Sequence, residues 1–393
     1  MVLTAKQEEG LKIAIDRYKA GERYTVISGY AGSGKSTLVK FIIDALQVDP
    51  FLDVCYVAYT GKAANVLQSK GNPNVRTLHK LLYNPKVFGE TISFELKSEL
   101  DEEYKIIVLD EVSMISQKMW QELLSFGVYV IACGDPGQLP PLAGEQTDVI
   151  HKPHVFLDEI MRQAQESEII RMSMIVREGK ELPLFKGNEV QVFTYNDLNQ
   201  GMLLWADQIL CATNANKNNL NHTIRKMLGR EGDLVPGEKI MCQSNQWEVF
   251  SDKGTALTNG TSLFVNSFYD KKQFYSPSLQ KGRPAIQLKM VNATSELGDK
   301  FNLLPLDLLY LRTGEESFTL KEHLSIKKSK KYQHVNPIPF DYSYAITTWK
   351  AQGSEWDKVL LLEENHPFSK EDHIKYMYTG ITRAAEKLVV IKK

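Results

Sequence analysis

The stretch GYAGSGKST, from Gly29 to Thr37, matches the pattern GxxxxGK[ST] in full. An apolar run, YTVIS, precedes it and a helix-like segment, TLVKFIIDAL, follows its start, which is the context that a phosphate-binding loop requires. Glycines let the backbone wrap around phosphate groups, and the start of the helix supplies aligned N–H donors. We therefore expect Lys35 to reach the β and γ phosphates of a nucleotide and the Ser36 hydroxyl to bind Mg²⁺. The residues expected to hold the nucleotide are Gly29, Ala31, Gly32, Ser33, Gly34, Lys35, Ser36 and Thr37.

A pair of adjacent acids, Asp110 and Glu111, follows the apolar run from Ile106 to Leu109. Carboxylates at the tip of a buried strand are costly without a cation, so the pair indicates the second half of the same site. We expect Asp110 to hold the Mg²⁺ shell and Glu111 to orient or deprotonate the attacking water. ATP hydrolysis is the predicted reaction. A GTPase is the alternative, but the sequence contains no NKxD element for guanine.

These motifs lie in a chain of 393 residues, enough for two or three domains, with 43% hydrophobic and 24% charged residues as in a soluble globular protein. No apolar run approaches the ~20 residues that span a bilayer, and the N-terminus resembles no signal peptide. We expect no membrane contact and a cytoplasmic location, which is the host cytoplasm if a phage encodes the chain. The four cysteines form no CxxC pair and predict neither a zinc site nor disulfides. A net charge of −1 argues against a DNA-coating protein but not against a DNA motor with contacts in one groove.

Seven strand-like runs alternate with helix-compatible segments, four of them within residues 24–135 and three within 207–393. Near-continuous apolar strands that alternate with helices indicate parallel sheets covered on both faces. The sequence therefore predicts an α/β fold with two such units. The runs are YTVISGY, DVCYVAYT, KIIVLDE, VYVIACGD, QILCAT, KVLLLEE and KLVVIKK.

Two β insertions are expected in this framework. Residues 261–340 contain strand-like pieces joined by Gly, Pro, Asn and Lys turns, which predict a small antiparallel β domain. Residues 271–335 carry twelve Lys or Arg against six Asp or Glu, including IKKSKKY at 326–332. A solvated surface and contact with nucleic-acid phosphates explain these charges equally well. Residues 83–96 predict a β-hairpin with a tight turn at Gly89-Glu90.

The N-terminal segment Thr4-Ala5-Lys6-Gln7 fits the S/T-x-x-Q capping box, which would start a helix in QEEGLKIAIDRYKA. This structural role is sufficient by itself to explain Gln7.

Nine short motifs in the right order along nearly the whole chain resemble those of the superfamily 1 DNA helicases of the B branch, the RecD- and Dda-like type. Trp349 departs from the family pattern, which usually has His there; an aromatic surface remains and an acceptor nitrogen is lost. The motifs, from Q and I to VI, are LTAKQEEGLKIA, GYAGSGKST, AYTGKAANVL (58–67), RTLHKLLY (76–83), IIVLDEVSM, GDPGQLPP (134–141), LDEIMRQ (157–163), YAITTWKAQGSEWDKV (344–359) and MYTGITRA (377–384).

The resemblance implies two RecA-like parallel-sheet P-loop domains with a small β-hairpin insertion and an SH3-like β insertion. Domain 1A is expected at 1–175, with the strand-separating hairpin (1B) at about 84–100. Domain 2A is expected at 176–260 and 341–393, and the SH3-like domain 2B at 261–340.

The resemblance also implies roles around ATP. Gln7 is expected to read adenine and Glu355 to contact the ribose. Gln138 is expected to touch the γ-phosphate, although DPGQ is also a good turn sequence. Arg162 and Arg383 are candidate arginine fingers, planar cations that stabilise charge on the transferred phosphoryl group. The expected catalytic residues are Lys35, Glu111, Gln138, Arg162 and Arg383.

Residues near strand ends are expected to bind DNA phosphates without reading sequence, and aromatic side chains among them can stack on bases. His79 is equally well explained as a partly buried helix residue. Phe94 is expected to wedge against the last base pair, with Phe88 as its rival, and a hairpin that only packs its own aromatics is an equal alternative. The expected DNA-binding residues are Thr60, Lys62, Thr77, His79, Phe94, Asn214, Thr347, Thr348, Trp349 and Lys350.

The predicted function is that of an ATP- and Mg²⁺-dependent DNA helicase that moves on single-stranded DNA and unwinds duplexes, with 5′→3′ polarity taken from the family. The alternatives are a translocase that does not unwind or acts on RNA, and an accessory protein switched by ATP. The expected partners are single-stranded DNA and its junction with duplex, together with replication or single-strand-binding proteins, and the chain is expected to be a monomer.

Overall fold

The computed structural model describes residues 3–88, 91–140, 147–161, 166–273, 286–318, 322–323, 335–364 and 369–393. Contacts between residues divide the chain into two compact units. Unit 1 consists of Met1–Leu82, Leu96–Lys217 and Ile346–Lys393, and unit 2 consists of Tyr83–Glu95 and Asn218–Ala345.

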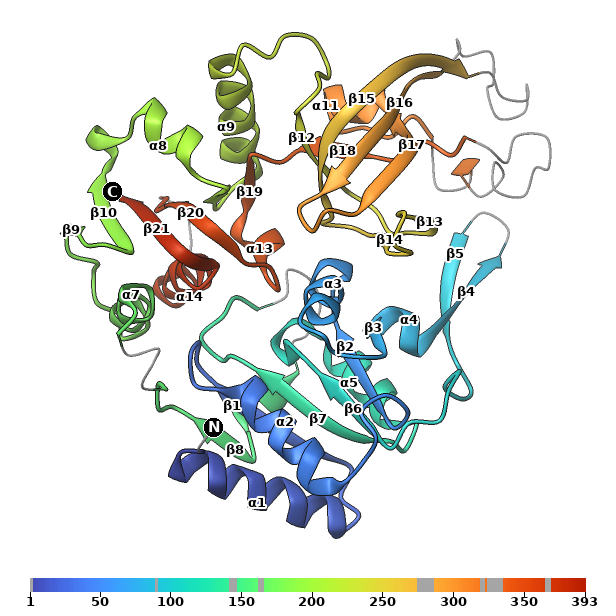
Figure 1. Ribbon diagram of the computed structural model, residues 1–393, viewed down its shortest axis with the longest axis vertical. Coiled ribbons are helices and arrows are strands. Elements are labelled where there is room, and N and C mark those ends of the chain that lie inside the picture. Colours follow the sequence, from blue (N-terminus) through green and yellow to red (C-terminus); the bar gives the residue numbers. More distant parts are fainter. Residues whose placement is uncertain are drawn as a thin grey trace. The chain divides into compact units, whose positions relative to one another are not determined.

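Unit 1 contains two six-stranded sheets (Figure 1). Each sheet, together with its helices, is here called one half of unit 1. In the first sheet every neighbouring pair of strands is parallel, so the carboxyl ends of β6, β7 and β1 lie side by side at one edge. The strands, in their order across the sheet, are β3 (Val75–Thr77), β2 (Val54–Ala58), β6 (Ile106–Leu109), β7 (Tyr129–Gly134), β1 (Tyr24–Gly29) and β8 (Val155–Leu157).

Helices α1 and α2 cover one face of this sheet. Ala14 of α1 and Leu38 and Ile42 of α2 pack in one core with alternate residues of the strands, as expected for a parallel sheet buried on both faces. The capping box at the start of α1 is confirmed, because Gln7 N donates to Thr4 Oγ1 at 3.3 Å and Thr4 N donates to Gln7 Oε1 at 3.0 Å. The helices of this half are α1 (Ala5–Lys19), α2 (Lys35–Leu46), α3 (Gly61–Ser69), α4 (Leu78–Leu82) and α5 (Gln117–Leu124), with 3₁₀ turns at Val112–Met114 and Asp148–His151.

The second sheet of unit 1 is parallel through β11, β20, β21 and β10, and β9 is added antiparallel at its edge. Its strands, in order, are β19 (Ala345–Thr347), β11 (Gln208–Cys211), β20 (Trp356–Leu362), β21 (Ala384–Lys392), β10 (Val190–Thr194) and β9 (Phe185–Lys186). The accompanying helices are α7 (Glu168–Arg177), α8 (Gln200–Trp205), α13 (Thr348–Ala351) and α14 (Lys370–Ile381), with a 3₁₀ turn at Tyr195–Asp197. Helix α9 (Asn214–Met227) begins in unit 1 and continues in unit 2.

Unit 2 is built on a five-stranded antiparallel sheet with its own apolar core. Two of its strands, β12 and β18, lie in whole or in part outside the predicted range 261–340. The strands, in order, are β17 (Lys300–Asp307), β16 (Ile286–Ser295), β15 (Ser262–Gln273), β12 (Lys239–Cys242) and β18 (Phe340–Tyr342). Unit 2 also contains helix α11 (Leu308–Thr313) and two hairpins, β13 (Gln246–Phe250) with β14 (Ala256–Leu257) and β4 (Tyr83–Phe88) with β5 (Thr91–Leu96).

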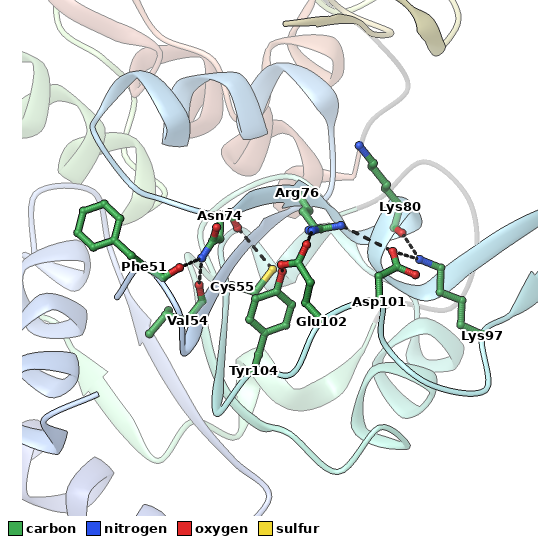
Figure 2. A network of polar contacts seen from close by, with 10 residues as sticks. All are labelled: Phe51, Val54, Cys55, Asn74, Arg76, Lys80, Lys97, Asp101, Glu102 and Tyr104. Atoms are coloured by element: carbon green, nitrogen blue, oxygen red, sulfur yellow. Dashed lines mark hydrogen bonds and ion pairs between the residues drawn. The ribbon is translucent and has the colours of Figure 1, made fainter. Parts of the chain in front are cut away.

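A network of charged and polar side chains, here named the hairpin base, lies where the chain leaves unit 1 for the β4–β5 hairpin and returns from it (Figure 2). Lys97 N donates to Leu82 O at 2.9 Å, which ties the outgoing and returning chain together. Lys97 Nζ donates to Asp101 Oδ2 at 2.7 Å and to Lys80 O at 3.0 Å. The hairpin base consists of Arg76, Lys80, Lys97, Asp101, Glu102 and Tyr104, with Glu102 bonded to both Arg76 and Tyr104.

The α/β fold class is confirmed, and all seven predicted strand runs contain strands. The predicted hairpin and the antiparallel β insertion are also confirmed for the residues that the structure describes. The boundaries of domains 1A, 1B, 2A and 2B, and the SH3-like assignment, stay predictions. All four cysteines are buried and free. Within the described ranges, no helix combines the length and the apolar character needed to cross a membrane.

Candidate ATP site and nucleic-acid interface

The predicted phosphate loop joins β1, which ends at Gly29, to the twelve-residue helix α2, which begins at Lys35. Gly32 and Gly34 adopt φ angles of +76° and +82°, a left-handed region that side chains rarely tolerate. A Cβ at Gly29 would lie 2.7 Å from Ser33 Oγ, so only glycine allows the loop to close on itself. The loop therefore directs the first N–H groups of α2 to one place, where phosphate binds well.

Lys35 is half-buried and lies over this loop. Its Nζ donates to Gly29 O at 2.7 Å and to Tyr30 O at 3.1 Å. The ring of Tyr30 faces Arg177 of α7, whose guanidinium carbon lies 3.6 Å from the ring centroid. The sequence analysis did not single out Arg177, because no motif that we assigned contains it.

The acids Asp110 and Glu111 follow β6 directly, beside the loop that follows β1. Burial, and next the neighbouring Glu111 carboxylate, raise the pKa of Asp110 to about 6. Glu111 has a φ of +55°, a conformation that is strained for a residue with a side chain and that often occurs at functional sites. The Glu111 N–H donates to Asp110 Oδ1 at 3.0 Å, which holds the Asp110 carboxylate against the backbone of Glu111.

Gln138 follows β7 and is only 7% exposed. Its amide can be oriented so that nitrogen donates to Glu111 Oε2 at 3.2 Å while oxygen accepts from Arg383 Nη2 at 3.3 Å. This orientation pairs a donor with the carboxylate and an acceptor with the guanidinium, so it is the one that the charges favour. We name Glu111, Gln138 and Arg383 the Gln138 cluster.

Arg383 lies at the end of α14 and is only 6% exposed. Its Nε donates to Thr379 O at 3.1 Å and its Nη1 donates to Ser354 O at 3.2 Å. The guanidinium is thus held by backbone oxygens from two segments, and its remaining nitrogen faces Gln138.

Residues from both halves of unit 1 line a cavity of about 270 Å³. Gly353, beside the cavity, has a φ of +71°, and a Cβ there would lie 2.7 Å from Cβ of Ala63, so the segment before β20 packs directly on α3. The polar residues that line the cavity include Ser36, Asp110 and Glu111 from the first half and Ser354, Glu355 and Arg383 from the second.

The oxygen donors at this cavity fit Mg²⁺. A Ser36 hydroxyl and an Asp110 carboxylate line the same space, and both are hard oxygen ligands. In the part of the chain that the structure describes, no three His, Cys, Asp or Glu side chains gather as a metal site. That is compatible with Mg²⁺, which is usually held by one or two carboxylates together with substrate phosphates and water.

Gln7 is 1% exposed and supports the phosphate loop from behind. Its Nε2 lies 3.3 Å from Ser33 O and 3.4 Å from Gly34 O, while its Oε1 accepts the bond from Thr4. Both ends of the amide are therefore used within the protein, and an adenine contact would require the release of one of them. Glu355, the predicted ribose contact, is half-exposed and lies 3.8 Å from Lys70 Nζ of α3.

Several predicted DNA-binding side chains have partners inside the first half of unit 1. Thr60 Oγ1 accepts from Ala63 N at 3.1 Å and caps α3, and Thr77 Oγ1 accepts from Lys80 N at 3.4 Å. Lys62, in contrast, has a partner in the second half, because its Nζ lies 4.2 Å from the ring centroid of Trp356 of β20. His79 packs beside Tyr59, and burial lowers the pKa of His79. His79 is thus a partly buried neutral residue at pH 7.

The predicted residues of the second half differ in exposure. Thr348 is fully buried and donates to Cys211 O at 3.4 Å, so its hydroxyl does not face a surface. Thr347 is also buried, whereas Trp349 is half-buried and Asn214 and Lys350 are exposed. Exposed residues can reach a nucleic-acid backbone directly.

Phe94 of β5 is 58% exposed, and its ring centroid lies 6.3 Å from that of Tyr83. A large exposed aromatic side chain is available for a wedge, as predicted for this hairpin. The side chain of Phe88, its rival, lies outside the described residues, as do Arg162 and the basic segment 326–332.

Comparisons with known proteins agree with this architecture. Residues 3–193 match the family model described as an AAA domain, and residues 342–391 match the UvrD-like helicase C-terminal domain. The fold resembles the crystal structure of Pif1 helicase from Candida albicans with a TM-score of 0.56 at 19% identity, covering 100% of this chain and 94% of that one.

Two curated relatives are DNA helicases by name. The chain is 28% identical over 282 residues to the ATP-dependent DNA helicase dda of Enterobacteria phage T4, covering 65% of this chain and 64% of that protein. It is 26% identical over 391 residues to the ATP-dependent RecD2 DNA helicase of Deinococcus radiodurans, covering 94% of this chain and 47% of that protein. The chain thus spans less than two thirds of the length of these relatives. In its ordered motifs, its two matched domain models and these relatives, the chain is similar to the superfamily 1B helicases.

Proposed function

We propose that the protein is an ATP-dependent DNA helicase that translocates on single-stranded DNA in the 5′→3′ direction and unwinds duplex DNA ahead of it. The cavity lined by Ser36, Asp110 and Glu111 on one side and by Ser354 and Arg383 on the other carries this proposal. A motor needs its nucleotide to bridge two structural halves, and this arrangement supplies such a site. The polarity rests on the family alone.

The residues of the site are suited to phosphoryl transfer from ATP to water. Lys35 and the N-terminus of α2 would hold the phosphates, and Ser36 and Asp110 would hold Mg²⁺, which neutralises phosphate charge when it is bound. Glu111, fixed by its backbone conformation, would orient the attacking water. Arg383 would face the charge that develops on the transferred group, and positioned charges of this kind contribute strongly in a site with little water.

Gln138 contacts both Glu111, which would orient the attacking water, and Arg383, which would face the transferred phosphoryl group. Because its amide lies between Glu111 and Arg383, movement of either half of unit 1 would alter both contacts at once. ATP binding is therefore expected to tighten the contacts of Gln138 with Glu111 and Arg383, and product release is expected to relax them. A cycle of closing and opening of this kind is what a translocating motor uses.

For DNA, we propose that the exposed Asn214 and Lys350 and the half-buried Trp349 contact the strand. Thr60, Lys62, Thr77, His79 and Thr347 are proposed to line its path. Phe94 is proposed to wedge against the junction. Phosphate contacts of this type hold a strand without reading its sequence. The protein is further proposed to act as a monomer in the cytoplasm, together with replication or single-strand-binding proteins.

The decisive experiment compares duplexes that carry only a 5′ or only a 3′ single-stranded tail, with and without ATP and Mg²⁺. We expect unwinding of the 5′-tailed substrate only, and only with ATP. Unwinding from the 3′ tail alone would refute the polarity.

The two rival functions give other results. DNA-stimulated ATP turnover without unwinding of either substrate would indicate a translocase that does not unwind. ATP binding without DNA-stimulated turnover would indicate a switch, and stimulation by RNA but not by DNA would change the substrate.

A further inference from the structure

The hydroxyl of Tyr378 joins three segments that are far apart in the sequence. Tyr378 lies in α14 and is 1% exposed. Its Oη accepts from the Ala31 N–H of the phosphate loop at 2.9 Å and donates to Asp135 Oδ2 at 2.6 Å. Burial raises the pKa of Tyr378, so the hydroxyl keeps its proton and remains a donor to Asp135.

Asp135 uses the second oxygen of its carboxylate to hold the turn that follows β7. Its Oδ1 accepts from the Gly137 N–H at 2.9 Å, and Asp135 itself is 2% exposed. A Cβ at Gly137 would lie 3.0 Å from Cε1 of Tyr378, so this turn packs directly against the tyrosine ring. The residue after Gly137 is Gln138, whose amide reaches Glu111 and Arg383.

The other side of the same turn is tied to the second half of unit 1. Leu139 N donates to Thr379 Oγ1 at 2.9 Å, and Gln352 Nε2 donates to Leu139 O at 2.7 Å. Residues 135–139 are therefore held by α14 and by the segment before β20. The Tyr378 hydroxyl connects this turn to the phosphate loop through a shared atom.

We propose that Tyr378 is a positioning residue that couples the phosphate loop to the Gln138 cluster. When the loop responds to nucleotide, the Ala31–Tyr378–Asp135 bonds transmit its position to the turn that aims Gln138. Tyr378 touches no phosphate in this scheme, and it acts on turnover only through Gln138, Glu111 and Arg383. The inference rests on the proposed ATP-driven function, because it assigns a residue to the coupling step of that function.

Tyr378→Phe is the matching test, because it removes one oxygen and keeps the ring that packs on Gly137. We expect the kcat of DNA-stimulated ATP hydrolysis to fall by about 10- to 100-fold, as for residues that orient a site without touching the substrate. The KM for ATP and the affinity for a fluorescent ATP analogue are expected to stay within about twofold of wild type, because the phosphate-binding groups are unchanged.

Tyr129→Phe is the control. Tyr129 is also buried, and its hydroxyl lies 2.6 Å from Thr25 Oγ1 and donates to Ala14 O at 3.2 Å, at the other end of β7 from Gln138. This variant also loses one buried tyrosine hydroxyl from unit 1, so any loss of folding stability should be similar. Its KM is expected to remain at the wild-type value, and so is its kcat once it is corrected for the folded fraction measured by thermal unfolding.

The outcomes separate the inference from the proposed function. Unchanged kcat in Tyr378→Phe, a rise in KM alone, or a loss of kcat equal to that of Tyr129→Phe would each overturn the inference. If wild type shows no stimulation by DNA, the proposed function fails. The inference is then judged by the same split of kcat and KM measured without DNA.

Discussion

The Gln138 cluster and the hairpin base belong to the same unit but are held together in different ways. In the cluster, contacts join distant parts of the chain, because Gln138 after β7 meets both Glu111 after β6 and Arg383 near the C-terminus. In the hairpin base the partners are local, with 26 positions between Arg76 and Glu102 and four between Lys97 and Asp101. The long-range contacts exist only when both halves of unit 1 are in place, whereas the local ion pairs form within one half.

This difference indicates that the Gln138 cluster and the hairpin base have separate roles. Contacts between two halves of unit 1 respond to anything that moves those halves, such as the binding of ATP. Contacts within one half are insensitive to that motion and can keep the hairpin anchored throughout a cycle. We therefore expect changes in the cluster to alter ATP turnover and changes in the hairpin to alter unwinding.

The largest effect is expected for Lys35→Ala. The variant removes the ammonium that lies over the phosphate loop, and we expect ATP turnover to fall by at least about a thousandfold. Steady-state ATP hydrolysis with single-stranded DNA measures this, with circular dichroism to establish folding. Lys12→Ala, an exposed lysine of α1, is the control and should keep full turnover. If Lys35→Ala kept ATP turnover near the wild-type rate, the assignment of the phosphate loop as the ATP site would be wrong.

Arg383→Lys is expected to have the next largest effect. Lysine keeps the positive charge but cannot reproduce a guanidinium that bonds to Thr379 O, Ser354 O and the Gln138 amide at once. We expect kcat to fall about a hundredfold or more while binding of a fluorescent ATP analogue is retained. Lys387→Arg, on the exposed surface of β21, should have no effect on turnover. A loss of binding equal to the loss of kcat would instead place Arg383 in ground-state recognition.

Much of the ATP site could be predicted from the sequence because its chemistry depends on residues close together in the chain. The glycine pattern before Lys35 and the acids after an apolar strand each define one half of the site by spacing alone. The roles of Gln138 and Arg383 at this site, in contrast, could be inferred only through resemblance. The left-handed backbone of Glu111 leaves no mark in the sequence, because glutamate is not the residue that this conformation favours.

The hairpin base was not predicted, for a different physical reason. Lys97, Asp101 and Glu102 read as part of an ordinary charged loop, and charged side chains most often lie in solvent. Only the fold buries the Lys97 side chain to 7% exposure beside the carbonyl of Lys80. The roles of Tyr378 and Asp135 were not predicted either. Each lies in a motif, MYTGITRA or GDPGQLPP, in which the sequence analysis assigned a role only to Arg383 or Gln138.

Phe94→Ala should separate the two regions by function. The side chain is exposed on β5, so its removal is expected to leave folding and ATP turnover unchanged while the rate of forked-duplex unwinding falls about tenfold, as expected when an aromatic contact to a base worth about 1–3 kcal/mol is lost. Stopped-flow unwinding and ATP hydrolysis on the same substrate measure both quantities. Tyr269→Ala, at an exposed aromatic residue of β15, is the control. Equal losses in unwinding and in ATP turnover would refute the proposal that the hairpin acts in unwinding and the Gln138 cluster in ATP turnover.

The smallest effect is expected for Lys97→Met, which keeps the aliphatic stem and removes the ammonium. Because Asp101 is half-exposed and stays solvated without its partner, we expect the free energy of unfolding to fall by only about 1–2 kcal/mol. ATP turnover with single-stranded DNA should be unchanged, whereas fewer base pairs should be unwound per ATP, since the hairpin loses an anchor at its base.

Lys105→Met is the matched control for this change. Lys105 lies on the same segment and pairs with Asp53 at 2.9 Å, but its side chain is 60% exposed, so its loss should lower the free energy of unfolding less than the loss of Lys97 does and leave unwinding unchanged. Lys97→Arg should restore most of the wild-type efficiency, because it returns a cation to Asp101. If Lys97→Met and Lys105→Met behave alike in chemical denaturation and in unwinding, the hairpin base is an ordinary surface ion-pair network. The hairpin base and the Gln138 cluster would then differ only in how deeply their side chains are buried. Local ion pairs that do not anchor the hairpin need not persist through the ATP cycle.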